Sequence, residues 1–264
     1  LDELLRGIAA RVFGADAKEM VLDAWDHFSQ AIRLVPDTGP RMGTNSAVGN
    51  PLFFEEPPAR TATFKYSWTD HAKWMSYLGG HIVPQWPFTA SHLVFCPDFT
   101  NRTNSAESYA RMSSGVQPDG DTAVLPVFLK YLRKASAEME EGLKLYRAAA
   151  LQSPDIKRQD AVREVVVAEH LQRMMQSNAA ILEFEDLRRQ FVTGEGGQEA
   201  RALLDRMECI LTEELARTER SLIAATRDSR LGFQFEQDYV YTPYSLGEKL
   251  ALLRDTLERQ LPDA

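Results

Sequence analysis

The stretch LPVFLKYLRKASAEMEEGLKLYRAA, residues 125–149, carries the clearest periodic pattern in this chain. Its apolar and small residues recur at alternating steps of three and four, a spacing that places side chains on one face of an α-helix. These positions are Leu125, Phe128, Leu132, Ala135, Met139, Gly142, Tyr146 and Ala149. A seam of this kind is typical of helices that pack in bundles. We therefore expect a long helix here that buries one face against its neighbours.

Two more apolar seams follow it, separated by Pro154 and by the glycine-rich turn at residues 194–197. The first contains Val165, Ala168, Leu171, Met175 and Leu182, widened by Met174 and Ile181. The second contains Leu204, Met207, Leu211, Leu215 and Leu222. Each helix would have roughly thirty residues and a length of about 45 Å. A last, shorter helix is expected from Pro243, because proline is favoured in the first turn. The sequence thus predicts a mainly α protein built on an antiparallel helical bundle.

Before the bundle, the pattern predicts two helices and then an irregular lobe. Residues 1–13 form the first helix, which Gly14 ends, and the second helix runs towards Pro36 with Trp25 in its core face. Asp16 and Glu19 resemble a capping box at the start of the second helix. From 36 to about 118, prolines, glycines and aromatic residues replace the helical pattern. We expect residues 1–118 to hold the helices and the lobe, residues 119–264 to hold the bundle, and both to form one compact unit.

Charge and composition exclude several classes of partner. The net charge of −8 argues against binding to nucleic acid or to an anionic membrane, both of which need basic patches. No apolar run approaches the roughly 20 residues of a membrane-spanning helix. The absence of a visible signal peptide favours the cytoplasm, although the chain opens at Leu1 inside an amphipathic pattern, as a piece of a longer protein would. Cys96 and Cys209 are expected to be buried free thiols, and a single disulfide stays open.

No complete catalytic or metal-binding signature is present in the sequence. The Glu-x-x-His motif of di-iron bundles is absent, and no zinc-type spacing accompanies the cysteines. The chain also lacks a phosphate-binding loop and a nucleophile elbow. We therefore expect no metal and no cofactor. Asn178, which falls among apolar residues, is interpreted as a buried amide that fixes the register of the bundle.

Two stretches carry the functional signal. In the irregular lobe, Trp68 and Trp86 lie among histidines and amides, a composition that suits stacking against sugar rings. The alternative interpretation is that these rings fill a core with little regular structure. The second stretch is DSRLGFQFEQDYVY, residues 228–241, here named the docking strap. Connections between helices are usually short, whereas this one is dense in acids, amides and aromatic residues, so we expect it to dock on a neighbour.

Both ends of the chain resemble one family. The opening, from Leu1 through Phe13 and on through the run Ala24–Ala31, is similar to the start of the helical region that follows the catalytic barrel in large bacterial glycoside hydrolases of the α-glucuronidase-like or hexosaminidase-like kind. The docking strap is similar to the end of that region. The resemblance implies that the pair of catalytic carboxylates lies on a barrel upstream of Leu1, so no catalytic residue is assigned in this chain.

The leading hypothesis is therefore an accessory helical domain of a carbohydrate-active hydrolase, not catalytic on its own. Its partners would be the catalytic barrel of the same protein, carbohydrate and, for some of its surface, a second copy in a homodimer. Under this hypothesis Arg230, Gln237, Tyr239 and Tyr241 contact the barrel or the substrate, and Asp228 orients Arg230. The alternatives are a free-standing carbohydrate-binding protein and a helical interaction scaffold without a small ligand.

Overall fold

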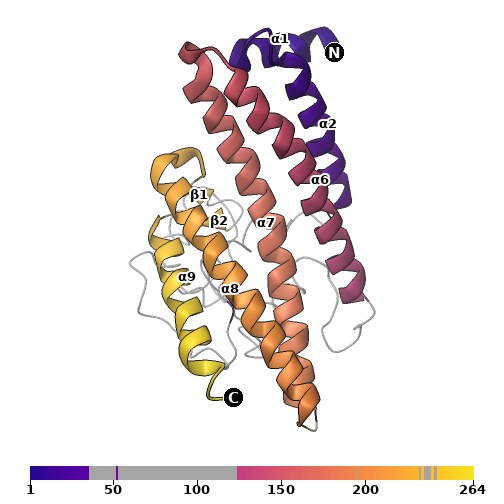
Figure 1. Cartoon of the computed structure of the whole chain (residues 1–264), viewed down its shortest axis with the longest axis vertical. Coiled ribbons are helices and arrows are strands. Elements are labelled where there is room, and N and C mark those ends of the chain that lie inside the picture. The colour runs from indigo at the N-terminus through magenta and orange to yellow at the C-terminus, as the bar shows by residue number, and fades with distance from the viewer. Residues whose placement is uncertain (36–51, 53–123, 195, 232, 235–238, 241–242) are drawn as a thin grey trace, which may run out of the picture. The chain divides into compact units, whose positions relative to one another are not determined.

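A computed structural model of the chain describes residues 1–35, 52, 124–194, 196–231, 233–234, 239–240 and 243–264 (Figure 1). These residues are almost entirely helical, and several long helices pack together, which confirms the prediction of a mainly α fold. The irregular lobe and the boundary expected near residue 118 lie outside the described residues. None of the helices in the described ranges is long and apolar enough to cross a membrane.

The helices begin and end close to the predicted positions. At the N-terminus lie α1 (Asp2–Phe13) and α2 (Lys18–Leu34). The three long helices are α6 (Val124–Gln152), α7 (Asp155–Thr193) and α8 (Gln198–Arg227). The chain then forms the short helix η3 (Ser229–Leu231), strands β1 (Phe233–Gln234) and β2 (Tyr239–Val240), α9 (Pro243–Asp255) and η5 (Thr256–Gln260).

Gly14 ends α1 as predicted, but the capping box at the start of α2 is wrong. The φ of Gly14 is 104°, a conformation that favours glycine, and its N–H donates to the Ala10 carbonyl. The residue that precedes α2 is Ala17, and no side chain caps the helix. Glu19 instead pairs with Arg6 of α1 at 3.4 Å. The two acids had the right spacing, but the helix begins two residues after Asp16, too late for its carboxylate to act as the cap.

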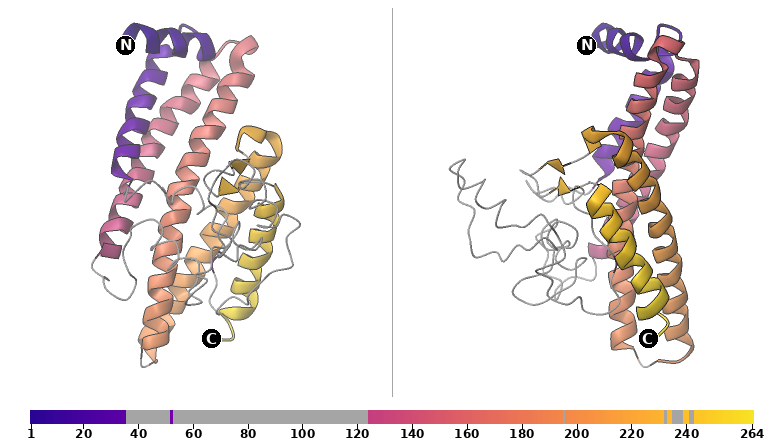
Figure 2. Two further views of the ribbon diagram at one scale, coloured as in Figure 1. Left: turned by 180° about the vertical axis from the view of Figure 1, so that it is seen from behind. Right: turned by 90° about the vertical axis from the view of Figure 1, so that its left-hand side faces the viewer.

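The chain divides into two compact units, each of which includes part of α7. The first unit contains Leu1–Pro36 and Ala123–Ala179, and the second contains Asp37–Thr122 and Ala180–Ala264. In the first unit α2 lies alongside α6, as both views of Figure 2 show. In the second unit α9 packs against α8.

The seam predicted on α6 forms the core of the first unit. Leu132, Ala135, Met139, Tyr146 and Ala149 are all buried. The rings of Phe13 and Phe28 lie 4.7 Å and 5.2 Å from that of Tyr146. A Cβ atom at Gly142 would lie 2.6 Å from a ring carbon of Phe28, so this glycine permits the close approach of α2 and α6.

The seam predicted on α7 is buried with one exception. Val165, Ala168, Met174, Met175, Ile181 and Leu182 are buried, whereas Leu171 is 37% exposed, so its place in the seam is wrong. Asn178 is fully buried, as expected. Its Nδ2 donates to the Met174 carbonyl of the same helix at 2.8 Å, and the register role assigned to it stays a prediction.

The seam predicted on α8 has the wrong phase in its second half. Leu204, Leu215 and Leu222 are only half-buried. The buried positions that follow Met207 and Leu211 are Glu214, Thr218, Ser221 and Ala225, still at steps of three and four. The prediction used apolar residues alone, and it therefore missed the second half of the buried face of α8, which is mostly polar. Cys209 was expected to be buried, but it is an exposed free thiol on this helix, and Cys96 lies outside the described residues.

Candidate functional site

The docking strap starts with a turn that Asp228 builds. Asp228 caps α8 in an extended conformation, and its N–H donates to the Ala224 carbonyl at 2.9 Å. Its Oδ1 accepts the backbone N–H of Arg230 at 3.0 Å, which is an Asx-type turn. The Leu231 N–H donates to the Asp228 carbonyl at 3.2 Å, and the Leu231 side chain is buried. The first four residues of the strap are thus fixed to the end of α8.

The same carboxylate holds the Arg230 guanidinium. Nε of Arg230 lies 3.1 Å from each Asp228 oxygen, and Nη2 lies 2.8 Å from Oδ2. The Asp228 side chain is 9% exposed, whereas that of Arg230 is 48% exposed. A buried acid therefore sets the direction of a half-exposed arginine, through the two-pronged geometry that guanidinium and carboxylate favour.

Beyond this turn the strap forms a two-stranded hairpin. β1 pairs with β2 in antiparallel register, with Phe233 opposite Val240 and Gln234 opposite Tyr239. The structure thus places the backbone of Tyr239 in β2. The other predicted contact residues, Gln237, Tyr241, Trp68 and Trp86, lie outside the described residues.

A cluster of buried charges lies between α8 and α9 in the same unit. Glu214 accepts hydrogen bonds from Arg217 on its own helix and from Lys249 on α9. Glu214 and Lys249 are fully buried, and Arg217 is 8% exposed. Burial lowers the pKa of Lys249, and the neighbouring Glu214 acts in the opposite direction. Because a hydrogen bond between buried charges joins α8 to α9, we interpret this cluster as a structural connection.

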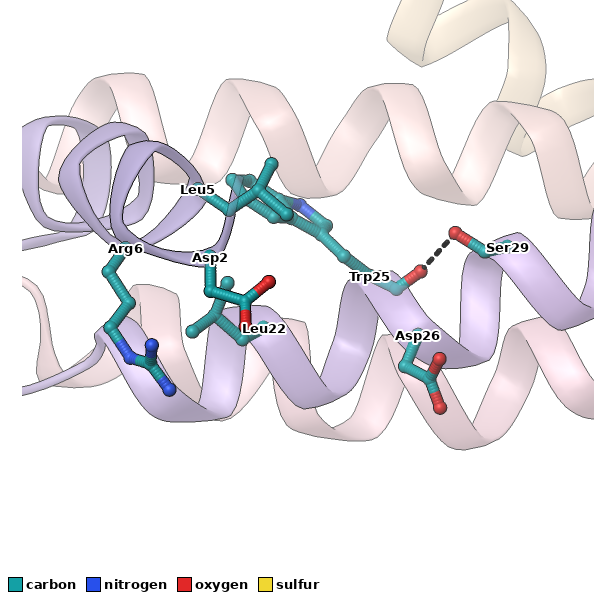
Figure 3. Close-up of a pocket in the computed structure, with 7 residues that line it drawn as sticks. All are labelled: Asp2, Leu5, Arg6, Leu22, Trp25, Asp26 and Ser29. Carbon is teal, nitrogen blue, oxygen red and sulfur yellow. Dashed lines mark hydrogen bonds between the residues drawn. The ribbon is translucent and has the colours of Figure 1, made fainter.

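The first unit contains a pocket of about 310 Å³ between α1 and α2 (Figure 3). It is lined by Asp2, Leu5, Arg6, Leu22, Trp25, Asp26 and Ser29. Trp25, which was expected in the core, is only half-buried and belongs to this lining. Its Nε1 donates to the Tyr146 hydroxyl at 3.2 Å, and burial raises the pKa of Tyr146 to about 12, so this hydroxyl keeps its proton at neutral pH. The hydrogen bond to Tyr146 therefore holds the Trp25 indole in place while the ring lines the pocket.

An ionic network joins α6 to α7 in the first unit. Arg147 of α6 donates to Glu169 of α7 at 3.0 Å and to Glu140 at 3.1 Å. Gln172 of α7 donates to Glu140 at 2.9 Å and to the Ser136 carbonyl at 3.3 Å. Glu140 and Glu169 are thus both engaged by groups that hold the two helices together.

No family model, no curated protein and no solved structure matches this chain. Among the described ranges, no three His, Cys, Asp or Glu residues gather where they could hold a metal ion.

The contact of Asp228 with Arg230 was predicted from the sequence. The buried charge cluster between α8 and α9 and the pocket at Trp25 were not. Asp228 and Arg230 are two residues apart, so their contact needs only a turn. Glu214 and Lys249 are 35 residues apart and meet only through packing. The signal that could have found Glu214 is its place three residues after Leu211, in the phase of the buried face of α8.

Proposed function

We propose that this chain is an accessory helical domain of a larger carbohydrate-active hydrolase and that the docking strap joins it to the catalytic domain. The resemblance of both ends of the chain to the helical region of such enzymes supports the class of parent protein. The observation that carries the docking role is the pairing of a buried Asp228 with a half-exposed Arg230. An accessory domain of this kind has no glycosidase activity of its own.

The geometry of Arg230 suits a contact with a neighbour for an energetic reason. A long side chain costs about 0.5–1.5 kcal/mol when an interface immobilises it. Asp228 already restrains Arg230 through contacts at 2.8–3.1 Å, so part of that cost is met before docking. A restrained guanidinium can stack on an aromatic face or share a second carboxylate, which is how arginine contributes to the centres of interfaces.

The coding sequence upstream of Leu1 gives the first test. We expect it to encode an α/β barrel that carries a pair of acidic residues. A start codon at that position, or cleavage of aryl glycosides by the purified chain alone, contradicts the proposal.

The second test compares two arginines of equal exposure. Arg230→Met should weaken the association of the chain with the separately expressed barrel at least tenfold, measured by titration calorimetry, with little change in melting temperature. Arg254→Met is the matched control, because Arg254 is 49% exposed and pairs with Glu219 at 3.0 Å. Equal effects of both changes on affinity, or a lower melting temperature for Arg230→Met without weaker association, would make Arg230 a structural clamp instead.

The pocket at Trp25 favours a second candidate function, carbohydrate binding. Its volume lies at the lower end of the range for small-molecule sites, which suits one or two sugar rings. The indole offers an apolar surface, while Asp2, Asp26 and Arg6 offer groups for hydroxyls.

Oligosaccharide titrations test this candidate. We expect saturable quenching of tryptophan fluorescence that Trp25→Phe and Asp26→Asn both reduce. Asp23→Asn, an exposed change on the same helix and outside the pocket lining, is the control. Quenching that Asp26→Asn and Asp23→Asn leave equally intact would remove the pocket as the sugar site.

A further inference from the structure

The middle of α7 is mostly buried but is not apolar. Every residue from 172 to 175 and from 177 to 182 is buried. A helix covered all round normally carries apolar side chains. This one carries Gln172, Arg173 and Asn178 within two turns. Polar groups in such a place need partners, and the partners of Gln172 are Glu140 and the Ser136 carbonyl.

Arg173 has a charge partner but lacks hydrogen-bond partners for one edge of its guanidinium. Its side chain is 8% exposed, and its Nη1 lies 3.7 Å from Oε2 of Glu169. Within the part of the chain that the structure describes, Nε and Nη2 of Arg173 make no hydrogen bond. The approach of Glu169 is to Nη1 only, and its other oxygen accepts from Arg147 at 3.0 Å.

The two unused donors belong to the same edge of the guanidinium. Nε–H and one N–H of Nη2 point in parallel, at the spacing of the two oxygens of a carboxylate or of two oxygens of a phosphate. Buried donors are nearly always satisfied in folded proteins, and leaving a charged one unsatisfied is costly. A buried, parallel pair of charged donors therefore has the geometry of a site for an anion.

The electrostatics of the neighbourhood agree with this geometry. Burial first, and then the charge of Arg173, lower the pKa of His170 to about 3. His170 is therefore neutral at physiological pH.

We propose that Arg173 binds a small-molecule anion, a carboxylate or a phosphate, through its Nε and Nη2 atoms. This site is independent of the docking strap and of the proposed function. Carboxylates and phosphates both offer two oxygens at the spacing of Nε and Nη2, and the choice of probes distinguishes the two classes.

Thermal denaturation of the full chain with three probes tests the site. Inorganic phosphate, acetate and D-glucuronate are titrated at constant ionic strength against chloride. We expect a saturable rise in melting temperature of several degrees with phosphate alone, which assigns a phosphate site, or with the two carboxylates, which assigns a carboxylate site. Arg173→Met should abolish the rise, and Arg173→Lys, which keeps the charge and loses the fork, should reduce it at least tenfold in apparent affinity.

Arg163→Met is the matched control on the same helix. The Arg163 side chain is 53% exposed and lies 3.8 Å from Asp160, so its loss should leave the rise intact. No saturable rise with any of the three probes overturns the proposal, as does an equal rise in wild type and Arg173→Met, which would identify an adventitious ion only. If a carboxylate of this chain already occupies the Nε–Nη2 edge of Arg173, none of the three probes raises the melting temperature. Arg173→Met then also has a lower melting temperature than the wild type in chloride.

A readout on the wild-type protein keeps the test valid if the variants do not fold. A bound anion lies at Arg173, whose charge acts on His170, so saturating probe at pH 7, where all three probes are anions, should shift the imidazole resonances of His170 in NMR spectra. Imidazole resonances that do not move with saturating probe also overturn the proposal.

Discussion

Glu214 accepts hydrogen bonds from two buried cations, Arg217 and Lys249. An ion pair without access to water gains from its attraction only if its members stay together, because each charge alone carries a large desolvation cost. The identity of the residue that is removed should therefore decide how much stability is lost.

Glu214→Leu should destabilise the protein by about 3–5 kcal/mol, since it leaves two buried cations without this acceptor. Lys249→Met should cost less, because the pair of Glu214 and Arg217 remains. Urea denaturation measures both. Glu219→Leu is the control: its pair with Arg254 is half-exposed, and such pairs contribute about 0–1 kcal/mol. Equal losses for Glu214→Leu and Glu219→Leu would show that burial does not govern the cluster.

His170 gives a prediction for the pH dependence of stability. Its pKa is about 3 in the folded protein and 6.5 in the unfolded chain. Between these values the unfolded chain binds more protons, so the free energy of unfolding falls as the pH falls. From pH 6.5 to pH 5 the loss through this one group is roughly 2 kcal/mol. His170→Leu should remove that part of the slope in urea denaturation at a series of pH values. If plots of the free energy of unfolding against pH are parallel for the wild type and His170→Leu, the prediction is wrong.

At the scale of the elements, the approach of α2 to α6 depends on Gly142. A side chain there would lie 2.6 Å from Phe28 and 2.9 Å from the Ala24 carbonyl oxygen, and the carbonyl belongs to the backbone of α2. The Ala24 carbonyl cannot yield without moving α2. Gly142 is thus a contact position rather than a flexible one.

Gly142→Ala should lower the stability by about 1–3 kcal/mol, the usual cost of overpacking a core. Gly7→Ala is the matched control, since Gly7 lies in α1 and an added Cβ would meet nothing within 4 Å. This control should raise the stability by roughly 0.5–1 kcal/mol, because alanine favours the helix. Thermal and urea denaturation report both changes. A gain for Gly142→Ala would mean that α2 and α6 are not in close contact.

The helices show which parts of the fold could be predicted from the sequence. Helix positions followed from apolar spacing and from Pro154, Gly14 and Pro243, because local sequence determines where a helix can begin and end. The buried face of α8 did not follow, because Glu214 and Ser221 occupy positions where the pattern expects apolar residues. Glu214 is joined to Lys249 of α9, and a contact between residues 35 apart cannot be read from the apolar pattern of α8. The contact of Asp228 with Arg230 was predictable, since two residues separate them.

At the scale of the whole molecule, α7 is the feature that the two compact units share. It is a single helix of 39 residues, and the division between the units falls after Ala179, within its length. The sequence does not show how contacts cluster, and the prediction that residues 1–118 and 119–264 form one compact unit stays a prediction. If α7 is cooperative along its whole length, the loss of its structure on one side of Ala179 should lower the stability of the other side.

We therefore expect both units to unfold in one transition. Hydrogen exchange followed by mass spectrometry should give α6 and α8 similar free energies of opening near their centres. Gly142→Ala, which changes only the first unit, should lower both values together. Gly7→Ala serves again as the control, with a small rise or no change in each. If Gly142→Ala lowers the value for α6 and leaves that for α8 unchanged, the units are independent and α7 acts as a linker between them, since a continuous cooperative helix would transmit the loss of stability past Ala179.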